Sequence, residues 1–386
     1  MDLLRIGLCF NLRSSGLPGS ASARDGPEDA QAEYDSWSTV SALAEALSFH
    51  GSCRVITLPF GPDLPHLLAA TRPDVVFNIA EGEWGRSRES LAPAVLELLG
   101  VPYVGSDPVA LGVAMDKALA KAVVAGSGVA VARGARVEVG EDAVEAAGLV
   151  PLPAFVKPVA EGSSKGVRRG SRVNTLDEMV RQVQWVHRWY GQAALVEEYL
   201  PGREFSVGLV GNGAPFALPV LEVRPLMPTP EGTFVYCYHT KSGNLEQYLC
   251  PAPITPQLSE QLVGAARTVF RALGLRDMAR VDFRLGADGT YRFLEVNPLP
   301  GLSATSLFTA QAAAAGLDLS ELVARIVHSA CIRWLDDPRL SPRLRDRLAA
   351  LVGTLEPGDG TFGAPAKESG QRVYPDLLVS ERLEEG

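Results

Sequence analysis

The 386-residue chain is poor in cysteine and histidine and has no long apolar segment. Its five cysteines are widely spaced and form no CxxC pair, which is typical of a protein from a reducing compartment. No run of about 18 apolar residues occurs, and the first residues turn polar too soon for a secretory signal. We therefore expect a soluble protein of the cytoplasm.

The chain also carries fewer positive than negative side chains. The 36 Lys and Arg residues against 45 Asp and Glu residues give a net charge of -9, which argues against a nucleic-acid groove and against affinity for anionic membranes. Neither the P-loop pattern nor the glycine-rich Rossmann pattern is present. Any phosphate site must therefore be local and built from other elements.

Strand-like and helix-like segments alternate over the first 115 residues. Buried-strand patterns cover residues 5–10, 53–58 and 74–79, and helical spacing covers residues 40–47 and 91–100. This alternation predicts an α/β lobe with a parallel sheet, in which ligands lie beyond the carboxyl ends of the strands. Loops 11–34 and 80–90 are therefore the expected ligand-binding loops.

The remaining chain divides by composition and pattern. We expect an N-terminal α/β lobe over residues 1–114, a central lobe over 115–201, a third lobe over 202–331 and an extension over 332–386. Within the extension, residues 339–353 are predicted to form a short surface helix. The Gly- and Pro-rich end after residue 356 is expected to be mobile or loosely packed.

The segment from Arg280 to Gly301 carries the strongest chemical signal. Asp288-Gly289 predicts a hairpin turn, so that Asp282 faces Glu295 and Arg280 faces Asn297. One face then holds Asp282, Glu295 and Asn297, and the other holds Val281, Phe283, Leu294 and Val296. Opposed carboxylates repel unless a cation lies between them, and two acids with an amide suit Mg²⁺. The alternative is a solvated hairpin neutralised by Arg280 and Arg284.

Other segments favour a bound nucleotide. Lys117 at a helix start, Lys157 at a strand end and the loop with Glu161, Ser163 and Ser164 would together neutralise a triphosphate. Each of them alone is also compatible with solvated surface. The acids Glu197, Glu198 and Glu204 either serve an adenosine or are ordinary surface charges.

The motifs LELLGVPYVGSD, FVKPVAEGSSKGV and RVDFRLGADGTYRFLEVNPLPG, in this order, resemble the ATP-grasp superfamily and, within it, the D-alanine-D-alanine ligases. The resemblance runs from about Val75 to Ser329. It implies an α/β ATP-grasp fold of three lobes, with an N-terminal parallel-sheet (pre-ATP-grasp) lobe and ATP held between the other two. It further implies an ATP-dependent acid-amine ligase, two Mg²⁺ ions with Mn²⁺ as a substitute, and a homodimer formed through the N-terminal lobe.

The same resemblance implies roles for individual residues. Lys117 and Lys157 match phosphate contacts, Glu204 matches the ribose acid, and Asp282, Glu295 and Asn297 match metal ligands. The adenine hinge corresponds to Glu197 with Glu198, Tyr199 and Leu200. Arg280 matches the arginine that stabilises the tetrahedral intermediate, and Lys241 belongs to a loop that closes over the phosphates. The carboxylate of the second amino acid corresponds to Ser306 with Gly301 and Leu307.

The elements for the first substrate depart from the family pattern. Loop 11–34 is longer and lacks the Ser-x-Glu element whose acid holds the first amine, and Glu81 stands where the family has histidine. In the mobile loop Ser242 replaces the tyrosine after Lys241. The added residues Arg86 and Arg88 would bind an extra carboxylate or phosphate on a larger acyl donor, or pair locally with Glu83 and Glu89.

The sequence therefore favours a ligase that joins a small carboxylate to a small amine through an acyl phosphate and releases ADP and phosphate. Its altered loops predict a first substrate other than plain D-alanine. The alternatives are an authentic D-alanine-D-alanine ligase of cell-wall synthesis and an ATP-grasp kinase that stops after phosphoryl transfer.

Overall fold

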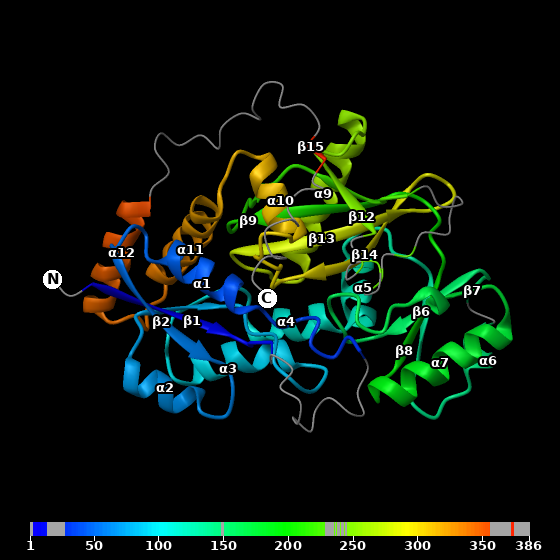
Figure 1. The fold of residues 1–386 in the computed structure, drawn as a ribbon, viewed down its shortest axis with the longest axis horizontal. Coiled ribbons are helices and arrows are strands. Elements are labelled where there is room, and N and C mark those ends of the chain that lie inside the picture. The colour runs from blue at the N-terminus through cyan, green and yellow to red at the C-terminus, as the bar shows by residue number, and fades with distance from the viewer. Residues whose placement is uncertain are drawn as a thin grey trace, which may run out of the picture.

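The computed structural model contains three β-sheets, each packed against helices (Figure 1). It describes residues 3–13, 28–147, 150–227, 235, 237, 240, 243, 245–355 and 372–373. Within these residues no helix is long and apolar enough to cross a membrane. The five cysteines are buried and are not joined by disulfides.

The strands are β1 (Leu4–Phe10), β2 (Cys53–Pro59), β3 (Val75–Asn78), β4 (Tyr103–Val104), β5 (Gly134–Val137), β6 (Ala154–Pro158), β7 (Arg172–Val173), β8 (Ala194–Glu198), β9 (Glu204–Val210), β10 (Phe216–Ala217), β11 (Leu221–Pro225), β12 (Glu246–Cys250), β13 (Met278–Leu285), β14 (Tyr291–Asn297) and β15 (Arg372–Val373). The helices are α1 (Trp37–Leu47), α2 (Leu64–Thr71), α3 (Leu91–Leu98), α4 (Pro108–Met115), α5 (Lys117–Gly126), α6 (Ala143–Ala147), α7 (Leu176–Tyr190), α9 (Pro256–Ala272), α10 (Leu307–Ala314), α11 (Leu319–Leu335) and α12 (Pro342–Leu355), with 3-10 turns η2 (Arg88–Ser90) and η3 (Arg169–Ser171).

The N-terminal sheet has the order β2-β1-β3-β4, and its strands pair in parallel. Side chains of β1 alternate between two cores, because successive residues of a strand point to opposite faces. Leu8 packs in the core that contains α1, α11 and α12, whereas Cys9 packs with α2 and α3. The predicted parallel α/β lobe is thus confirmed. Loops after β1 and β3 leave the sheet at its carboxyl edge.

The predicted C-terminal helix exists as α12, and its apolar side is buried rather than lying on the surface. Leu348 is fully buried in the same core as β1 and α1. Arg347 donates to the Leu3 carbonyl at 2.7 Å and pairs with Asp74 at 2.7 Å. Figure 1 shows α11 and α12 beside α1, at the end of the molecule that holds the N-terminal sheet. Most of the stretch from 356 to 386, predicted to be mobile, lies outside the described residues.

The other two sheets hold the remaining strands. A four-stranded sheet of order β5-β8-β6-β7 packs against α7, and a seven-stranded sheet contains the path β14-β13-β9-β11-β12-β15. β10 pairs with β9 outside that path. The division of the chain into lobes stays a prediction, since α11 and α12 pack on the N-terminal sheet although they follow the large sheet in sequence.

The β13-β14 hairpin has the predicted register at the end away from its turn, where the predicted metal ligands lie. Asp282 pairs with Glu295, and Arg280 pairs with Asn297. The register then shifts, so that Phe283 pairs with Phe293 and Leu294 is the extra residue of a bulge. The prediction that Leu294 fills the core is therefore wrong: Phe293 is fully buried in its place, and Leu294 lines a pocket. The register shifts because the turn is longer than the two predicted residues. The last strand pair before the turn is Leu285 with Tyr291.

The packing of α12 predicts that Leu348→Ala lowers the free energy of unfolding by about 2–5 kcal/mol, because the substitution leaves a cavity in a fully buried site. Urea unfolding followed by circular dichroism measures the change. Arg343→Ala, on the exposed side of the same helix, is the matched control. Equal stability of the two variants would show that α12 is an appendage and not part of the core.

Candidate active site

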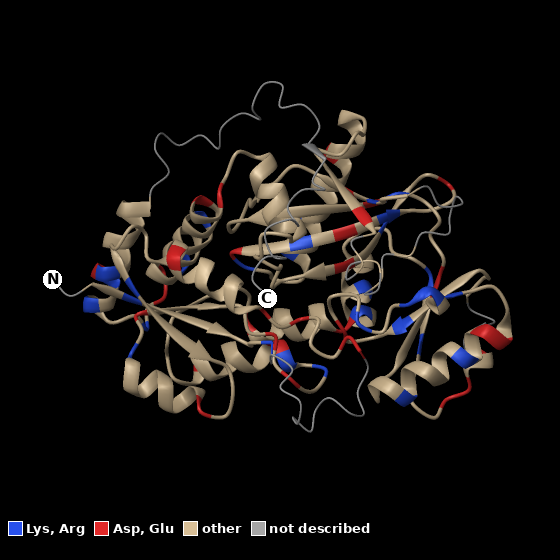
Figure 2. Cartoon of the chain, viewed as in Figure 1, with Lys and Arg blue, Asp and Glu red and all other residues tan. Residues whose placement is uncertain are grey.

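Two adjoining pockets lie where the three sheets meet. The larger has a volume of about 410 Å³ and is lined by residues that follow β1, β3, β6 and β14. The smaller, of about 90 Å³, lies between the four-stranded and seven-stranded sheets. Both are lined by Lys117, Glu161, Arg280, Glu295 and Leu307. Acidic and basic residues gather in this central region, around α4, α5 and β14 (Figure 2).

The smaller pocket is lined by all the residues predicted to bind the nucleotide except Ser163. Its apolar walls include Phe155, Leu200 and the bulge residue Leu294, and the Tyr199 ring stacks on Phe155 with centroids 6.2 Å apart. The polar lining consists of Lys117, Lys157, Glu161, Ser164, Glu197, Glu198 and Glu204 among others. Apolar and aromatic walls together with lysines match a base joined to a polyphosphate.

Glu197 is buried between two lysines. Its carboxylate pairs with Lys121 at 2.7 Å and with Lys157 at 3.0 Å. Burial opposes ionisation, but these two cations hold the pKa of Glu197 below its ordinary value. Lys121 was missed in the sequence, although it lies one helical turn after Lys117 and therefore points the same way. Glu197 thus fixes Lys157 at the edge of the pocket.

The predicted metal ligands converge on neighbouring strands. Asp282 accepts hydrogen bonds from Asn297 at 3.0 Å and from Ser206 at 2.6 Å, and pairs with Arg280 at 2.9 Å. Glu295 pairs with Lys117 at 3.3 Å. Arg284, the other arginine considered for neutralising the hairpin acids, instead bonds Glu204 at 3.3 Å and the Gly202 carbonyl.

This donor set fits a magnesium ion. No group of three or more His, Cys, Asp and Glu side chains in the described part of the chain is arranged to hold a metal. The hairpin offers two carboxylates and an amide, and these hard oxygen ligands leave positions for phosphate oxygens and water, as Mg²⁺ requires. Because Asp282 and Glu295 are cross-strand partners, an ion between them would relieve their repulsion.

The larger pocket has an acidic wall. Asp35, Glu81 and Glu89 line it, from the segment before α1 and the loop after β3. Burial raises the pKa of Asp35 to about 7 and that of Glu89 to about 7. The pKa of Glu81 is also raised, first by burial and then by the neighbouring Glu89. A proton or a cationic ligand is therefore favoured at this wall.

Arg86 and Arg88, predicted as anion-binding residues, have acidic partners far away in the sequence. Arg86 pairs with Asp116 at 2.9 Å. Arg88 is only 4% exposed and its guanidinium binds Glu33 at 2.6 Å and Glu161 at 3.1 Å. Glu33 was missed in the sequence, where nothing in the long loop after β1 distinguished it from surface acids.

Ser306 is the N-cap residue of α10 and lines the larger pocket with Gly301 and Leu307. Its hydroxyl donates to the Gly301 and Ser303 carbonyls. Ser163 and Ser164 lie in a tight loop with positive φ angles of 47° and 62°, and Ser163 faces the larger pocket. Lys241 and Ser242 lie outside the described residues.

Comparison with known proteins assigns the family. A family model described as D-ala D-ala ligase C-terminus matches residues 121–328. The D-alanine-D-alanine ligase of Caulobacter vibrioides is 38% identical over 299 residues, which cover 76% of this chain and 87% of that protein. The chain belongs to the D-alanine-D-alanine ligase family. It is thus an ATP-dependent ligase that forms carbon-nitrogen bonds, as predicted.

Solved structures of this family share the fold. The D-alanine-D-alanine ligase of Bacillus anthracis complexed with ATP aligns with a TM-score of 0.65 at 21% identity and covers 86% of this chain and 98% of that one. The VanG D-Ala:D-Ser ligase of Enterococcus faecalis aligns with a TM-score of 0.64 at 20% identity and covers 85% of this chain and 100% of that one. The predicted α/β ATP-grasp fold is confirmed.

The acidic wall predicts a pH-dependent stability. A carboxyl with a folded-state pKa of about 7 destabilises the folded protein once the pH rises above its lower unfolded-state value, so Asp35→Asn should raise the melting temperature at pH 8. The gain should shrink as the pH falls to 5, because wild-type Asp35 is then protonated when folded. Thermal unfolding at several pH values tests this, with the exposed Glu260→Gln as control. A gain independent of pH would refute the assigned direction.

Proposed function

We propose that the protein is a D-alanine-D-alanine ligase, which joins two D-alanine molecules and converts ATP to ADP and phosphate. The observation that carries the proposal is the convergence of Lys117, Lys157 and the Asp282-Glu295-Asn297 set on pockets shared with Arg280 and Ser306. Its 38% identity to a D-alanine-D-alanine ligase over most of that enzyme supports the substrate.

The expectation of a larger, anionic first substrate loses its basis. It depended on Arg86 and Arg88 being available to bind an additional carboxylate or phosphate. Arg88 is instead buried between Glu33 and Glu161, and Arg86 pairs with the fully buried Asp116. The acidic wall of Asp35, Glu81 and Glu89 favours the ammonium group of an amino acid over an anion.

Activation of the first carboxylate needs a nucleotide whose terminal phosphate faces it. The adenine would lie against Phe155, Leu200 and Leu294, with Glu198 to Leu200 as the backbone hinge and Glu204 for the ribose, since all of these residues line the smaller pocket. Lys117 and Lys157 line the same pocket and would offset the charge of the transferring phosphoryl group. Asp282, Glu295 and Asn297 would hold Mg²⁺, which supplies further charge stabilisation at the phosphates.

The peptide bond would then form in the larger pocket, which shares Arg280 with the smaller one. The acyl phosphate carries a good leaving group, and the amine of the second D-alanine attacks it after losing a proton. Arg280 lines both pockets and can stabilise the oxyanion of the tetrahedral intermediate. Ser306 and the start of α10 are placed to bind the second carboxylate, since the first turn of a helix presents free N-H groups.

The proposal predicts ADP, phosphate and D-alanyl-D-alanine in equal amounts when the protein is incubated with ATP, Mg²⁺ and D-alanine. Glu295→Gln should lower kcat by about 100-fold or more, because one hard anionic ligand is lost at the phosphates. Coupled ADP release and chromatographic detection of the dipeptide measure both, with Glu260→Gln as the surface control.

Three results would count against this function. ADP without dipeptide would favour the kinase. Release of AMP would exclude an acyl phosphate route. Turnover only with another carboxylate in place of the first D-alanine would restore the expectation of a different donor.

A further inference from the structure

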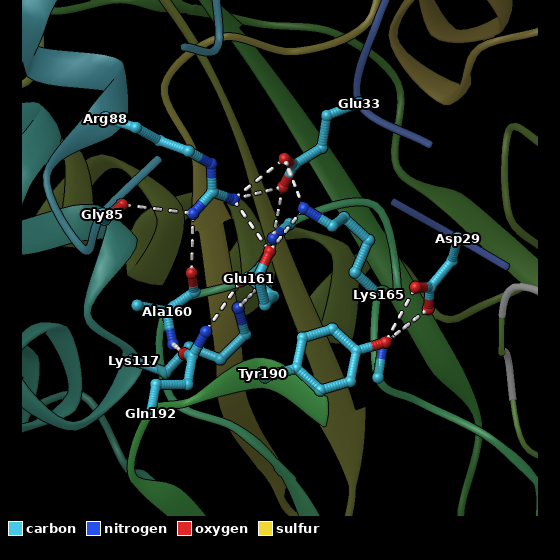
Figure 3. A network of polar contacts seen from close by, with 12 residues as sticks. Asp29, Glu33, Gly85, Arg88, Lys117, Ala160, Glu161, Lys165, Tyr190 and Gln192 are labelled. Carbon is cyan, nitrogen blue, oxygen red and sulfur yellow. Dashed lines mark hydrogen bonds and ion pairs between the residues drawn. The ribbon is translucent and has the colours of Figure 1, made fainter. Parts of the chain in front are cut away.

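The segment before α1 reaches across to the central lobe. Residues 28–36, here named the strap, contact residues 161–166, the loop that carries Ser163 and Ser164 and is here named the serine loop. These segments are more than a hundred residues apart in the sequence. Figure 3 shows Asp29 and Glu33 of the strap directed toward Lys165, Glu161 and Tyr190 of the central lobe.

One acid of the strap holds the far end of the serine loop. The Asp29 carboxylate is 7% exposed and accepts the backbone N-H of Gly166 at 2.8 Å. The Tyr190 hydroxyl, at the end of α7, donates to the same carboxylate at 2.7 Å. Gly166 has a φ of +74°, and a Cβ there would meet Pro158 at 2.2 Å, so this end of the loop is sterically fixed.

A second acid holds the near end. Glu33 accepts the backbone N-H of Gly162 at 2.7 Å and pairs with Lys165 at 3.1 Å. Arg88 binds the same carboxylate at 2.6 Å and the Ala160 carbonyl at 2.9 Å, which ties the loop after β3 to the same point. A Cβ on residue 162 would lie 2.7 Å from the Glu33 carboxylate, so the contact requires glycine.

Both serines therefore lie between two anchored glycines. Ser163 faces the larger pocket and Ser164 the smaller one, and Lys117 donates to the Glu161 carbonyl of the same loop. Strap residues from Ala32 to Ser36 form part of the wall of the larger pocket. If the strap released the serine loop, this wall would open beside the groups that face the phosphates.

We propose that Asp29 and Glu33 are positioning residues that clamp the serine loop onto the N-terminal lobe and keep water away from the activated carboxylate. The inference rests on the proposed ATP-dependent ligation. Without the clamp, the serine loop would lose its fixed position beside the pockets, and water would compete with the amine for the acyl phosphate. Water attack forms a new carbon-oxygen bond, breaks the bond to phosphate, and returns the original acid with ADP and phosphate released.

The test uses the full-length variants Glu33→Gln, Asp29→Asn and Tyr190→Phe. Glu28→Gln is the matched control, because Glu28 is an exposed acid of the same strap. Tyr190→Phe keeps the Asp29 to Gly166 contact and removes only one hydroxyl, so it remains informative if the charge variants fail to fold.

Amide hydrogen exchange measures the clamp directly. Exchange in the peptide that spans residues 160–168 should rise about tenfold or more in the Glu33 and Asp29 variants, since each replaces a charge-assisted hydrogen bond to the loop with a weaker neutral one. The control should exchange as the wild type does. Unchanged exchange in the clamp variants would overturn the proposal, because the contacts would then not hold the loop.

Kinetics separate positioning from mere stability. The KM for ATP should rise about tenfold in the clamp variants, and ADP should exceed dipeptide, whereas the wild type and Glu28→Gln release them in equal amounts. A variant that only melts earlier, with unchanged KM and equal ADP and dipeptide, would refute the positioning role. If wild type makes no dipeptide from D-alanine, the proposed function fails. The clamp is then tested by exchange and by affinity for Mg-ATP, which should fall in the variants.

Discussion

Several buried carboxylates in this protein are held in place by cations, and these ion pairs join separate sheets and loops. A carboxylate removed from water costs several kcal/mol unless it is paired and hydrogen-bonded. Glu197 binds two lysines, Glu33 binds Arg88 and Lys165, and Asp116 binds Arg86 and Arg136. The pairs of Glu33 and of Asp116 join the loop after β3 to the loop after β6 and to β5, whereas the pairs of Glu197 join α5 to β6 and β8. The net charge of -9 says little about this region, where the two signs are interleaved.

Two carboxylates of the β13-β14 hairpin also have cationic partners. Lys117 contacts Glu295, and Arg280 contacts Asp282, so each of the two hairpin carboxylates has a cation beside it. If a divalent ion were bound by these carboxylates, as proposed, Lys117 would become available to phosphate oxygens. Exchange of one set of ion pairs for another costs less than bringing bare charges together, because no group is left unpaired in a region of low dielectric constant. Glu197 differs, since both its lysines remain anchored from within the protein.

The sequence predicted the parallel N-terminal sheet and the pairing of Asp282 with Glu295, because both follow from short-range patterns. The alternation of side chains and the Asp288-Gly289 turn signal can both be recognised within a stretch of about twenty residues. The bulge at Leu294 escaped this reasoning, since a turn of two residues and a longer turn with a compensating bulge bring the same acids face to face. The partners of Arg88 and the role of Glu33 were not predictable, because they depend on contacts between segments that no local period relates.

The contacts of Asp29, Glu33 and Arg88 explain how the long segment after β1 and the loop after β3 are held in place. A short loop after β1 needs no internal support, whereas the long segment found here must be fixed if it is to form a pocket wall. Asp29 and Glu33 supply that support by bonding backbone N-H groups of the serine loop, and Arg88 and Lys165 neutralise the buried Glu33. Arg88 thereby serves a contact within the protein, between the loop after β3 and the long segment before α1.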